Sequence, residues 1–390
     1  MNIVIIPAFF QTKKNPTFGS FFTDQAKALQ KSGHYVSILY CDTYSVKCIR
    51  DYVEYEEETV FEDEGVRILR KRIFCPLKHG MEGYRTQFAK IIGQLYDQYL
   101  ADEKVDIIHA HCCVWAGYAA MKLSERTRIP YIVTEHATLF QLHRDKIGHK
   151  NNIWIREVFG RAARLICVSR AFGKLLSEYR TDIDIVGNVV DCDRFELVEP
   201  VQKSDTVRFL TVCYMVDEAM LYKKGIDILL RAWRDLSAKN PNVRLTIGGG
   251  GQGVSKVVEW CREYGIEQTV ELTGKLSRDQ VASQMRGCDV FVLPSRYETF
   301  GVVYIEAMAC GKPVIAVANG GPDDFVTEEN GILIPAGDPE KLEQAFECIL
   351  QNLEKYDAAL IRKLVADRFG AQAIAEQLER IYQDVQVHKS

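Results

Sequence analysis

Two glutamates in the second half of the chain carry groups suited to chemistry on a hydroxylated substrate. Glu298 and Glu306 lie in the segment PSRYETFGVVYIEAMACGKPVIA, which predicts strand, turn, helix, cap and strand. Glu306 lies about a turn and a half into the helix, so the two carboxylates do not form a close acid and base pair. A carboxylate accepts paired hydrogen bonds from neighbouring hydroxyl groups, so one glutamate suits a ribose and the other a hexose. The spacing alone leaves equally open that Glu298 is a solvated turn residue and Glu306 a pairing residue on a helix.

The same segment predicts a phosphate site without a Walker lysine. The backbone amides of Phe300, Gly301 and Val302 come at the start of the expected helix. Such amides have no partner within the helix and lie at the positive end of its dipole. We therefore expect a diphosphate to bind there.

Composition places this chain among soluble two-domain proteins. Its 390 residues exceed what one hydrophobic core usually spans, and 47% hydrophobic with 26% charged residues is ordinary for a globular protein. A net charge of -4 argues against a nucleic-acid partner. The opening MNIVIIPAFF suits a buried strand better than a signal peptide, and no apolar run is long enough to cross a membrane. We expect a cytoplasmic protein whose 12 cysteines are small core residues.

Short β-rich runs alternate with helical stretches almost from end to end, which predicts an α/β fold with two doubly wound parallel sheets. We expect a first domain over 1–199, a second over 200–370, and a helix over 371–388 that packs back on the first. Two such domains would face a cleft, with functional residues just after strands. Expected strands cover 2–6, 35–40, 66–73, 106–109, 131–134, 164–168, 184–186, 206–213, 243–247, 270–273, 289–293, 313–317 and 331–334. The acidic stretch 51–64, followed by basic residues, is interpreted as an irregular surface excursion.

The E-x7-E pair of Glu298 and Glu306 resembles, with its flanks, the donor-site signature of family 4 of the retaining GT-B glycosyltransferases. The flanks that match are LTGKLSRDQVASQMRGCDVFVLPS before the pair and NGGPDDFVTEENGILIPAGDPEKL after it. Further upstream, KKGIDILLRAW and VGNVVDCDRF resemble the family's lysine-glycine helix start and interdomain segment. The resemblance implies a GT-B fold of two Rossmann-like domains and a nucleotide-sugar-dependent transferase.

The resemblance also implies roles for individual residues. Glu306 would bind the donor ribose, Glu298 the hydroxyls of the transferred sugar and Lys224 the diphosphate. The backbone at Phe300 to Val302 would add further contacts. Without that context, a lysine before a glycine is more often a solvated charge.

In the first half, PYIVTEHATLF places His136 at the carboxyl end of a buried strand. It resembles the family's histidine near the reacting carbon, although a lone histidine there is more often structural. His109 and His111 in HAHCCVWAG superficially suggest a metal, but adjacent strand residues face opposite sides, the cluster lacks an Asp or Glu partner, and a structural role is favoured.

Two departures from the family pattern concern the diphosphate. Gly19 resembles the glycine of the acceptor-side loop, but the usual double glycine is absent. The arginine that commonly precedes the lysine is also absent from CYMVDEAMLYKKG, where Tyr214 or Met215 stands in the expected region. Lys223 is the candidate to compensate.

The expected reaction moves a sugar from a UDP- or GDP-linked donor to a hydroxyl acceptor with retention of configuration, without a cofactor or a metal ion. Preorganised charge around the leaving diphosphate would lower the barrier. Asp-x-Asp strings at Asp182 to Asp184 and Asp191 to Asp193 are the argument for a metal, but both are interpreted as loop residues.

Three other functions compete with this interpretation. A nucleotide-sugar epimerase or hydrolase on the same architecture needs an added base, which nothing near Glu298 clearly supplies. A dinucleotide-dependent oxidoreductase needs a glycine motif opening a helix, whereas Gly248 to Gly251 is more simply a tight turn. A non-catalytic nucleotide-sugar binding module would not need two cleft-forming domains.

The acceptor is the least determined partner. Basic and aromatic residues gather within 67–79 and again within 143–161, which suits a saccharide or lipid-linked saccharide acceptor at the inner face of a membrane. Solvated charged faces are an equally good interpretation. The family resemblance favours surface polysaccharide or glycolipid assembly.

Overall fold

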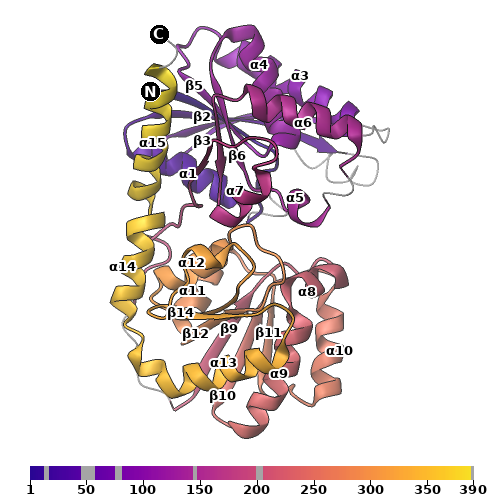
Figure 1. The fold of residues 1–390 in the computed structure, drawn as a ribbon, viewed down its shortest axis with the longest axis vertical. Helices are drawn as coiled ribbons and strands as arrows, with labels where there is room; N and C mark the ends of the chain where they lie inside the picture. The colour runs from indigo at the N-terminus through magenta and orange to yellow at the C-terminus, as the bar shows by residue number, and fades with distance from the viewer. Residues whose placement is uncertain (13–16, 45–57, 75–80, 144–146, 199–204, 388–390) are drawn as a thin grey trace. The chain divides into compact units, whose positions relative to one another are not determined.

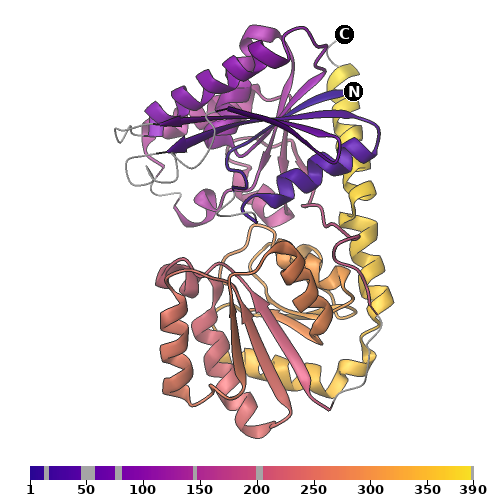
Figure 2. The same ribbon diagram turned by 180° about the vertical axis from the view of Figure 1, so that it is seen from behind.

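The computed structural model describes residues 1–12, 17–44, 58–74, 81–143, 147–198 and 205–387. The chain divides into two compact units (Figures 1 and 2). Met1–Val189 and Ala371–Ser390 form the first unit, and Val190–Gly370 the second.

The first unit is a single sheet with helices on both faces. Its strand order is β3-β4-β2-β1-β5-β6-β7-β8, and every neighbouring pair is parallel except β3 and β4. The strands are β1 (Asn2–Pro7), β2 (Tyr35–Tyr44), β3 (Glu58–Asp63), β4 (Val66–Phe74), β5 (Ile107–His111), β6 (Tyr131–Glu135), β7 (Arg164–Cys167) and β8 (Ile183–Ile185). The central strands β1, β5 and β6 are buried almost throughout, as a sheet covered on both faces requires, although β5 and β6 also bury polar side chains.

Helix α1 packs against the C-terminal helix α15, and α3 packs against α4 (Figure 1). The helices are α1 (Ser20–Lys31), α3 (Met81–Tyr99), α4 (Tyr118–Thr127), α5 (Leu139–Leu142), α6 (His149–Arg161), α7 (Arg170–Leu176) and α15 (Ala371–Val387), with a π-helical turn η2 (Cys113–Gly117) before α4. The C-terminal helix is fastened by Tyr382, whose hydroxyl lies 2.7 Å from His109 Nδ1, and by Glu379, 2.9 Å from His34 Nε2.

The interpretation of 51–64 as irregular is wrong for its described part. Residues 58–63 form β3, which pairs antiparallel with β4. The pairing sets Glu62 opposite Arg67, and such opposite charges favour a cross-strand pair. Glu64 and Gly65 both have positive φ, 48° and 81°, as the tight turn of a two-residue hairpin requires. Residues 51–57 lie outside the described chain.

The second unit has the strand order β11-β10-β9-β12-β13-β14, all parallel. Numbered from β9, this is the Rossmann order, whose direction reverses between β9 and β12. Its strands are β9 (Val207–Val212), β10 (Val243–Gly248), β11 (Val270–Gly274), β12 (Val290–Leu293), β13 (Val314–Val317) and β14 (Gly331–Ile334). Its helices are α8 (Glu218–Lys224), α9 (Ile226–Lys239), α10 (Val254–Tyr264), α11 (Arg278–Gly287), α12 (Val302–Ala309), α13 (Pro339–Asn352) and α14 (Ala358–Phe369), with 3-10 turns η4 (Pro322–Asp324) and η5 (Leu353–Lys355).

The structural division falls between Val189 and Val190, ahead of the boundary expected at 199/200. The segment after Val189 joins the second unit because its backbone is bonded there. Val190 N donates to Phe369 O at 2.8 Å, and Arg362 donates to the carbonyls of Phe195 and Cys192 at 2.7 and 2.8 Å. A polar stretch therefore marks the expected linker, whereas hydrogen bonds set the observed one.

Candidate active site

The turn after β12 leads directly into α12. Gly301, the residue before α12, has φ of 96°, and a Cβ there would come within 2.5 Å of the Tyr304 ring. Tyr304 is itself fixed, because its hydroxyl donates to Leu293 O at 2.6 Å. Glycine is thus required where the backbone turns into the helix, and the amides that open α12 come at the carboxyl end of β12.

An ion pair joins the two strands that flank the reversal of strand order. Lys224, which follows β9, donates from Nζ to Glu298 Oε1, which follows β12, at 2.6 Å. The two side chains are 17% and 11% exposed. Burial alone lowers the pKa of Lys224, but the attraction and hydrogen bond of Glu298 outweigh it, and the pKa is raised. The carboxyl ends of these two strands are where ligands bind in open α/β sheets.

The lysine segment is held against the loop that follows β12. Gly225 has φ of 70°, and a Cβ there would lie 2.0 Å from Pro294 O. The carbonyl of Lys223 accepts a hydrogen bond from Arg296 N at 2.8 Å. The Lys223 side chain is half-buried, and burial followed by the charge of Lys224 lowers its pKa. Two lysines therefore lie beside one carboxylate.

Arg296 and Asp227 brace the same loop, and nothing in the sequence pattern predicted their contact. Arg296 donates to both carboxylate oxygens of Asp227, each at 2.8 Å, and its Cζ lies 3.8 Å from the centroid of the Tyr222 ring. A bidentate pair combined with ring stacking fixes a guanidinium in one orientation. The pair ties the start of α9 to the residues just before Glu298.

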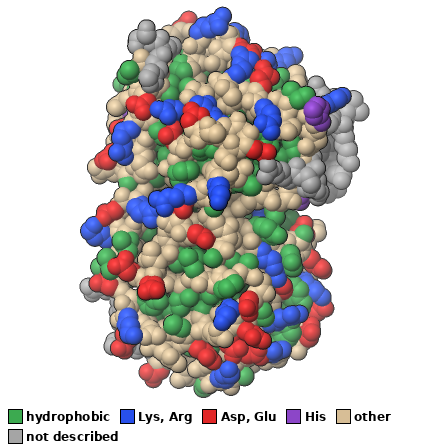
Figure 3. Space-filling model, in the orientation of Figure 1, with side chains coloured by type: hydrophobic (Ala, Val, Ile, Leu, Met, Phe, Trp, Pro, Cys, Tyr) green, Lys and Arg blue, Asp and Glu red, His purple; other side chains and the backbone are tan. Residues whose placement is uncertain are grey.

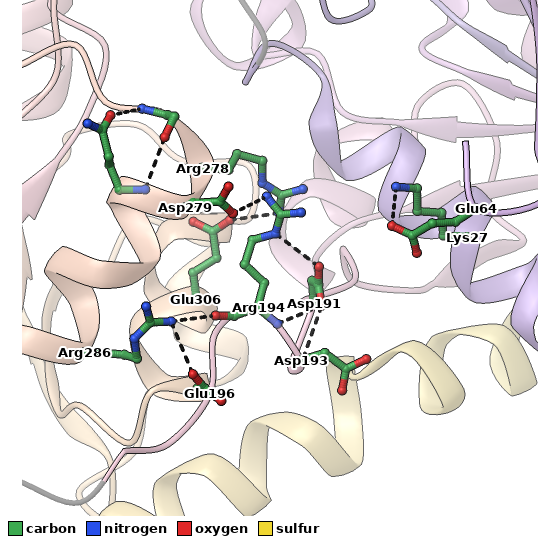
Figure 4. A network of polar contacts seen from close by, with 12 residues as sticks. Lys27, Glu64, Asp191, Asp193, Arg194, Glu196, Arg278, Asp279, Arg286 and Glu306 are labelled. Atoms are coloured by element: carbon green, nitrogen blue, oxygen red, sulfur yellow. Dashed lines mark hydrogen bonds and ion pairs between the residues drawn. The ribbon is translucent and has the colours of Figure 1, made fainter. Parts of the chain in front are cut away.

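Glu306 has a different cationic neighbour. Its Oε1 lies 3.6 Å from Arg278 Nη2, and the two side chains are 10% and 15% exposed. Arg278 begins α11, and the next residue, Asp279, pairs with Arg194 at 3.1 Å (Figure 4). The two glutamates thus have separate cations, which agrees with the prediction that they are not a close acid and base pair.

In the first unit, the three buried histidines form hydrogen bonds. His111 Nδ1 lies 3.0 Å from His136 Nε2, and the Gln25 amide nitrogen lies 3.4 Å from His111 Nε2. His109 stacks on His111 with ring centroids 4.4 Å apart. Burial lowers the pKa of His109 and of His136 to about 3, so both rings are neutral at pH 7. Because a neutral imidazole has one donor and one acceptor, the Gln25 amide, donating to His111, directs His111 to donate from Nδ1 to His136.

Glu135 shapes the backbone beside these rings. Its carboxylate accepts hydrogen bonds from the amides of Cys113, His136 and Ala137 at 2.7, 3.0 and 2.8 Å. Burial nevertheless raises its pKa. The carboxylate thus holds the start of η2 and the chain after β6 together, and it lies beside the HAHCCVWAG cluster, for which no acidic partner was expected. Cys112 has φ of 71°, an uncommon value for a residue with a Cβ, so the chain bends sharply here.

Two family models cover most of the chain. "Glycosyltransferase Family 4" matches residues 19–194, and "Glycosyl transferases group 1" matches residues 213–384. A glycosyltransferase of Methanocaldococcus jannaschii, itself uncharacterized, is 31% identical over 260 residues, which are 65% of this chain and 68% of the relative. The chain belongs to glycosyltransferase family 4.

Solved structures show the same GT-B fold for this glycosyltransferase. Sucrose-phosphate synthase from Thermosynechococcus elongatus matches with a TM-score of 0.79 at 20% identity, over 100% of both chains. Anabaena HepE in complex with UDP-glucose matches with a TM-score of 0.71 at 18% identity, over 98% of this chain and 100% of the other.

Gly19 and the two Asp-x-Asp strings are the remaining predicted residues of the glycosyltransferase. Gly19 precedes α1 with φ of 73°, where a Cβ would lie 3.1 Å from Phe9 O. Of the Asp-x-Asp strings, Asp182 pairs with Arg180 and Asp191 with Arg194, whereas Asp184 is in β8 rather than a loop. Within the described chain, no group of acidic, histidine and cysteine residues is arranged to hold a metal ion.

The two basic clusters contain many ion-paired residues. Arg67 pairs with Glu103 and Arg161 with Glu125 and Glu157. Side chains of both signs are interspersed over the face in Figure 3. Lys78, His79, Arg144 and Lys146 lie outside the described residues. Each helix in the described ranges is too short or too polar to cross a bilayer.

Proposed function

We propose that this glycosyltransferase moves a sugar from a nucleoside diphosphate sugar to a hydroxyl group of a saccharide or lipid-linked saccharide. The observation that carries the proposal is the Lys224–Glu298 pair, 2.6 Å apart, at the strand reversal beside the start of α12. A diphosphate matches the ammonium group and the helix amides, and a sugar hydroxyl matches the carboxylate.

Each donor group then has a candidate partner. Lys224, with Lys223 in place of the missing arginine, would bind the diphosphate together with the amides of Phe300 to Val302. Glu298 would bind the hydroxyls of the transferred sugar. Glu306, held near Arg278, would bind the ribose diol. The resemblance adds His136 at the sugar or leaving phosphate and Gly19 at the diphosphate.

The proposed reaction retains the anomeric configuration. The acceptor oxygen bonds to the anomeric carbon, the bond from that carbon to the phosphate oxygen breaks, and the acceptor proton passes to the departing phosphate. Lys224 and the α12 amides stabilise the negative charge that develops on the phosphate. Neither a metal ion nor a cofactor has a part in this scheme.

We infer the donor base and the biological process from similar proteins. UDP-glucose in the Anabaena HepE complex supports a UDP-linked donor, with GDP as the alternative. We propose surface polysaccharide or glycolipid assembly, in the cytoplasm and at the inner face of the membrane.

A thermal-shift screen against UDP, GDP, ADP and their sugar conjugates tests the donor site. A ligand at a hundred times its Kd stabilises by about 2.7 kcal/mol, a readily measured rise in the midpoint. We expect one base to raise the midpoint of the parent and barely that of Glu306→Ala. The control, Glu259→Ala, removes an exposed glutamate of α10 and should respond like the parent. If no nucleotide changes the midpoint, the proposal fails.

Product analysis then separates transfer from the competing reactions. With the bound donor and a panel of saccharide acceptors, we expect a product with the donor's anomeric configuration by NMR, also in the presence of EDTA. Release of free sugar alone would indicate a hydrolase, and an isomerised donor an epimerase.

A further inference from the structure

Arg85, in the second turn of α3, is a buried cation without an anionic partner among the described residues. The residue is 7% exposed, and its Nε and Nη1 atoms are shielded from water with no hydrogen-bond partner. No carboxylate pairs with it in the parts of the chain that the structure describes. A charge removed from water at such cost is ordinarily paired.

Two aromatic rings, nearly perpendicular to each other at 80°, pack against the Arg85 guanidinium. Its Cζ lies 4.5 Å from the centroid of Tyr118 and 4.4 Å from that of Trp154. Attraction to ring faces offsets only part of the cost of burying a charge. It also leaves Nε and Nη1 without a hydrogen-bond acceptor, and guanidinium N–H groups bind a carboxylate or a phosphate. The two rings hold the cation in place for a ligand that supplies the missing acceptors.

Arg85, Tyr118 and Trp154 lie in the first two turns of helices that begin at the ligand-binding edge of the sheet. Tyr118 begins α4 after β5, Trp154 lies in the second turn of α6, which follows β6, and Arg85 lies in α3, which follows β4. Helices that follow parallel strands begin at the carboxyl edge of the sheet, where ligands of such sheets bind. Trp115, one turn before Tyr118, is 36% exposed and offers a ring face to a sugar.

We propose that Arg85, packed against Tyr118 and Trp154, binds an anionic group of the acceptor, either a phosphate or a carboxylate. That the bound anion belongs to an acceptor rests on the proposed function, whereas the anion site itself does not. The glycosyltransferase would then prefer acceptors that carry a phosphate or a uronic acid near the receiving hydroxyl.

Anion titration of the full chain without donor tests the site. The midpoint of unfolding is followed in low-salt buffer with inorganic phosphate, glucuronate or neutral glucose, each against chloride at equal ionic strength. We expect phosphate or glucuronate, but not glucose, to raise the parent midpoint by a few degrees, with saturation. The more effective anion distinguishes the phosphate from the carboxylate.

Arg85→Met removes the proposed site. We expect it to lose the anion-dependent rise and, in chloride alone, to unfold no earlier than the parent, because an uncompensated charge has been removed. The control is Arg156→Met on α6, whose guanidinium also packs against a ring, Tyr179, but lies 3.9 Å from Glu178. It should keep the rise. So should Lys224→Met, which excludes the donor site as the source.

Three results would overturn the proposal. They are no rise in the parent, an undiminished rise in Arg85→Met, and a lower Arg85→Met midpoint in chloride with the anion response kept. If Arg85→Met does not fold, Arg85→Lys, which keeps the charge but not the planar guanidinium, should show a weakened rise. Donor binding is read separately, so its failure would leave the anion result intact.

Discussion

Breaking the Lys224–Glu298 pair should destabilise the second unit more than removing the pair as a whole. Lys224→Met replaces the ammonium group by an apolar chain of similar length and leaves the Glu298 carboxylate, 11% exposed, without its partner at 2.6 Å. Loss of one partner of a buried pair costs about 3–5 kcal/mol. Since both side chains keep some exposure, we take the lower end, about 3 kcal/mol, which lowers the midpoint by roughly 6–12 °C for a unit of this size.

The double-mutant cycle isolates the interaction between the two charges. Glu298→Gln should also destabilise, because it leaves the lysine buried opposite a neutral amide. The double variant Lys224→Met with Glu298→Gln has no unpaired charge, so its loss should be well below the sum of the single losses, by about 2 kcal/mol. Calorimetry of the transition of the second unit measures each term.

A matched surface pair provides the control. Lys363 pairs with Asp367 one turn along α14, with side chains 70% and 59% exposed, and Lys363→Met should leave the midpoint almost unchanged. Strictly additive losses at Lys224 and Glu298 would refute the view that each charge compensates the other in the folded protein. Both single variants and the double variant should also lose transferase activity.

Four further predictions follow from the geometry. Gly225→Ala, at positive φ against a backbone carbonyl, should cost more than about 3 kcal/mol, whereas Gly265→Ala, at similar φ with nothing within 4 Å, should cost about 1 kcal/mol by chemical denaturation. Arg278→Leu should raise the donor KM about tenfold, roughly 1.4 kcal/mol, because Glu306 loses the cation beside its carboxylate; an unchanged KM would contradict this. Burial lowers the pKa of His136 from 6.5 to about 3, so the unfolded chain takes up protons that the folded chain does not; stability should be full above pH 6.5 and fall toward pH 3. His136→Gln should make that fall shallower, and His109 and His111, whose pKa values burial also lowers, account for the part that stays. Glu135→Gln should cost about 2 kcal/mol and lower kcat, because its amide cannot accept all three backbone hydrogen bonds; equal midpoints would contradict this.

The sequence predicted elements best where burial alone sets the pattern. Each apolar run of the second unit became a parallel strand, and Gly331–Ile334 has the expected bounds. The strand β3 was missed because half of its residues, Glu58, Glu62 and Asp63, are acidic, and only the folded sheet sets Lys71 and Arg67 of β4 opposite Glu58 and Glu62. A local pattern cannot show a partner strand whose charges decide the pairing.

The candidate site likewise combines residues that are contiguous in the sequence with residues that are distant in it. The segment from Glu298 to Glu306 is contiguous, so its turn and helix start could be inferred directly. The cations that hold these glutamates, Lys224 and Arg278, are distant in the sequence, and only the strand order brings them together. Arg85 could not be predicted as a site residue from the sequence, because only the folded structure shows that no described carboxylate pairs with its guanidinium.

The discontinuous first unit has a consequence for the newly made chain. Tyr382, the partner of His109, and the face of α15 that covers α1 are translated only after the whole of Val190–Gly370. At about 5–20 residues per second, the ribosome leaves α1 without that cover for roughly 17 to 70 seconds, because α1 ends at Lys31 and α15 begins at Ala371. The nascent protein thus has to protect an apolar helix face while another unit is being synthesised. A stop codon near Gly370 would leave that face permanently bare, so truncated chains should aggregate or bind chaperones even though every residue of the second unit is present.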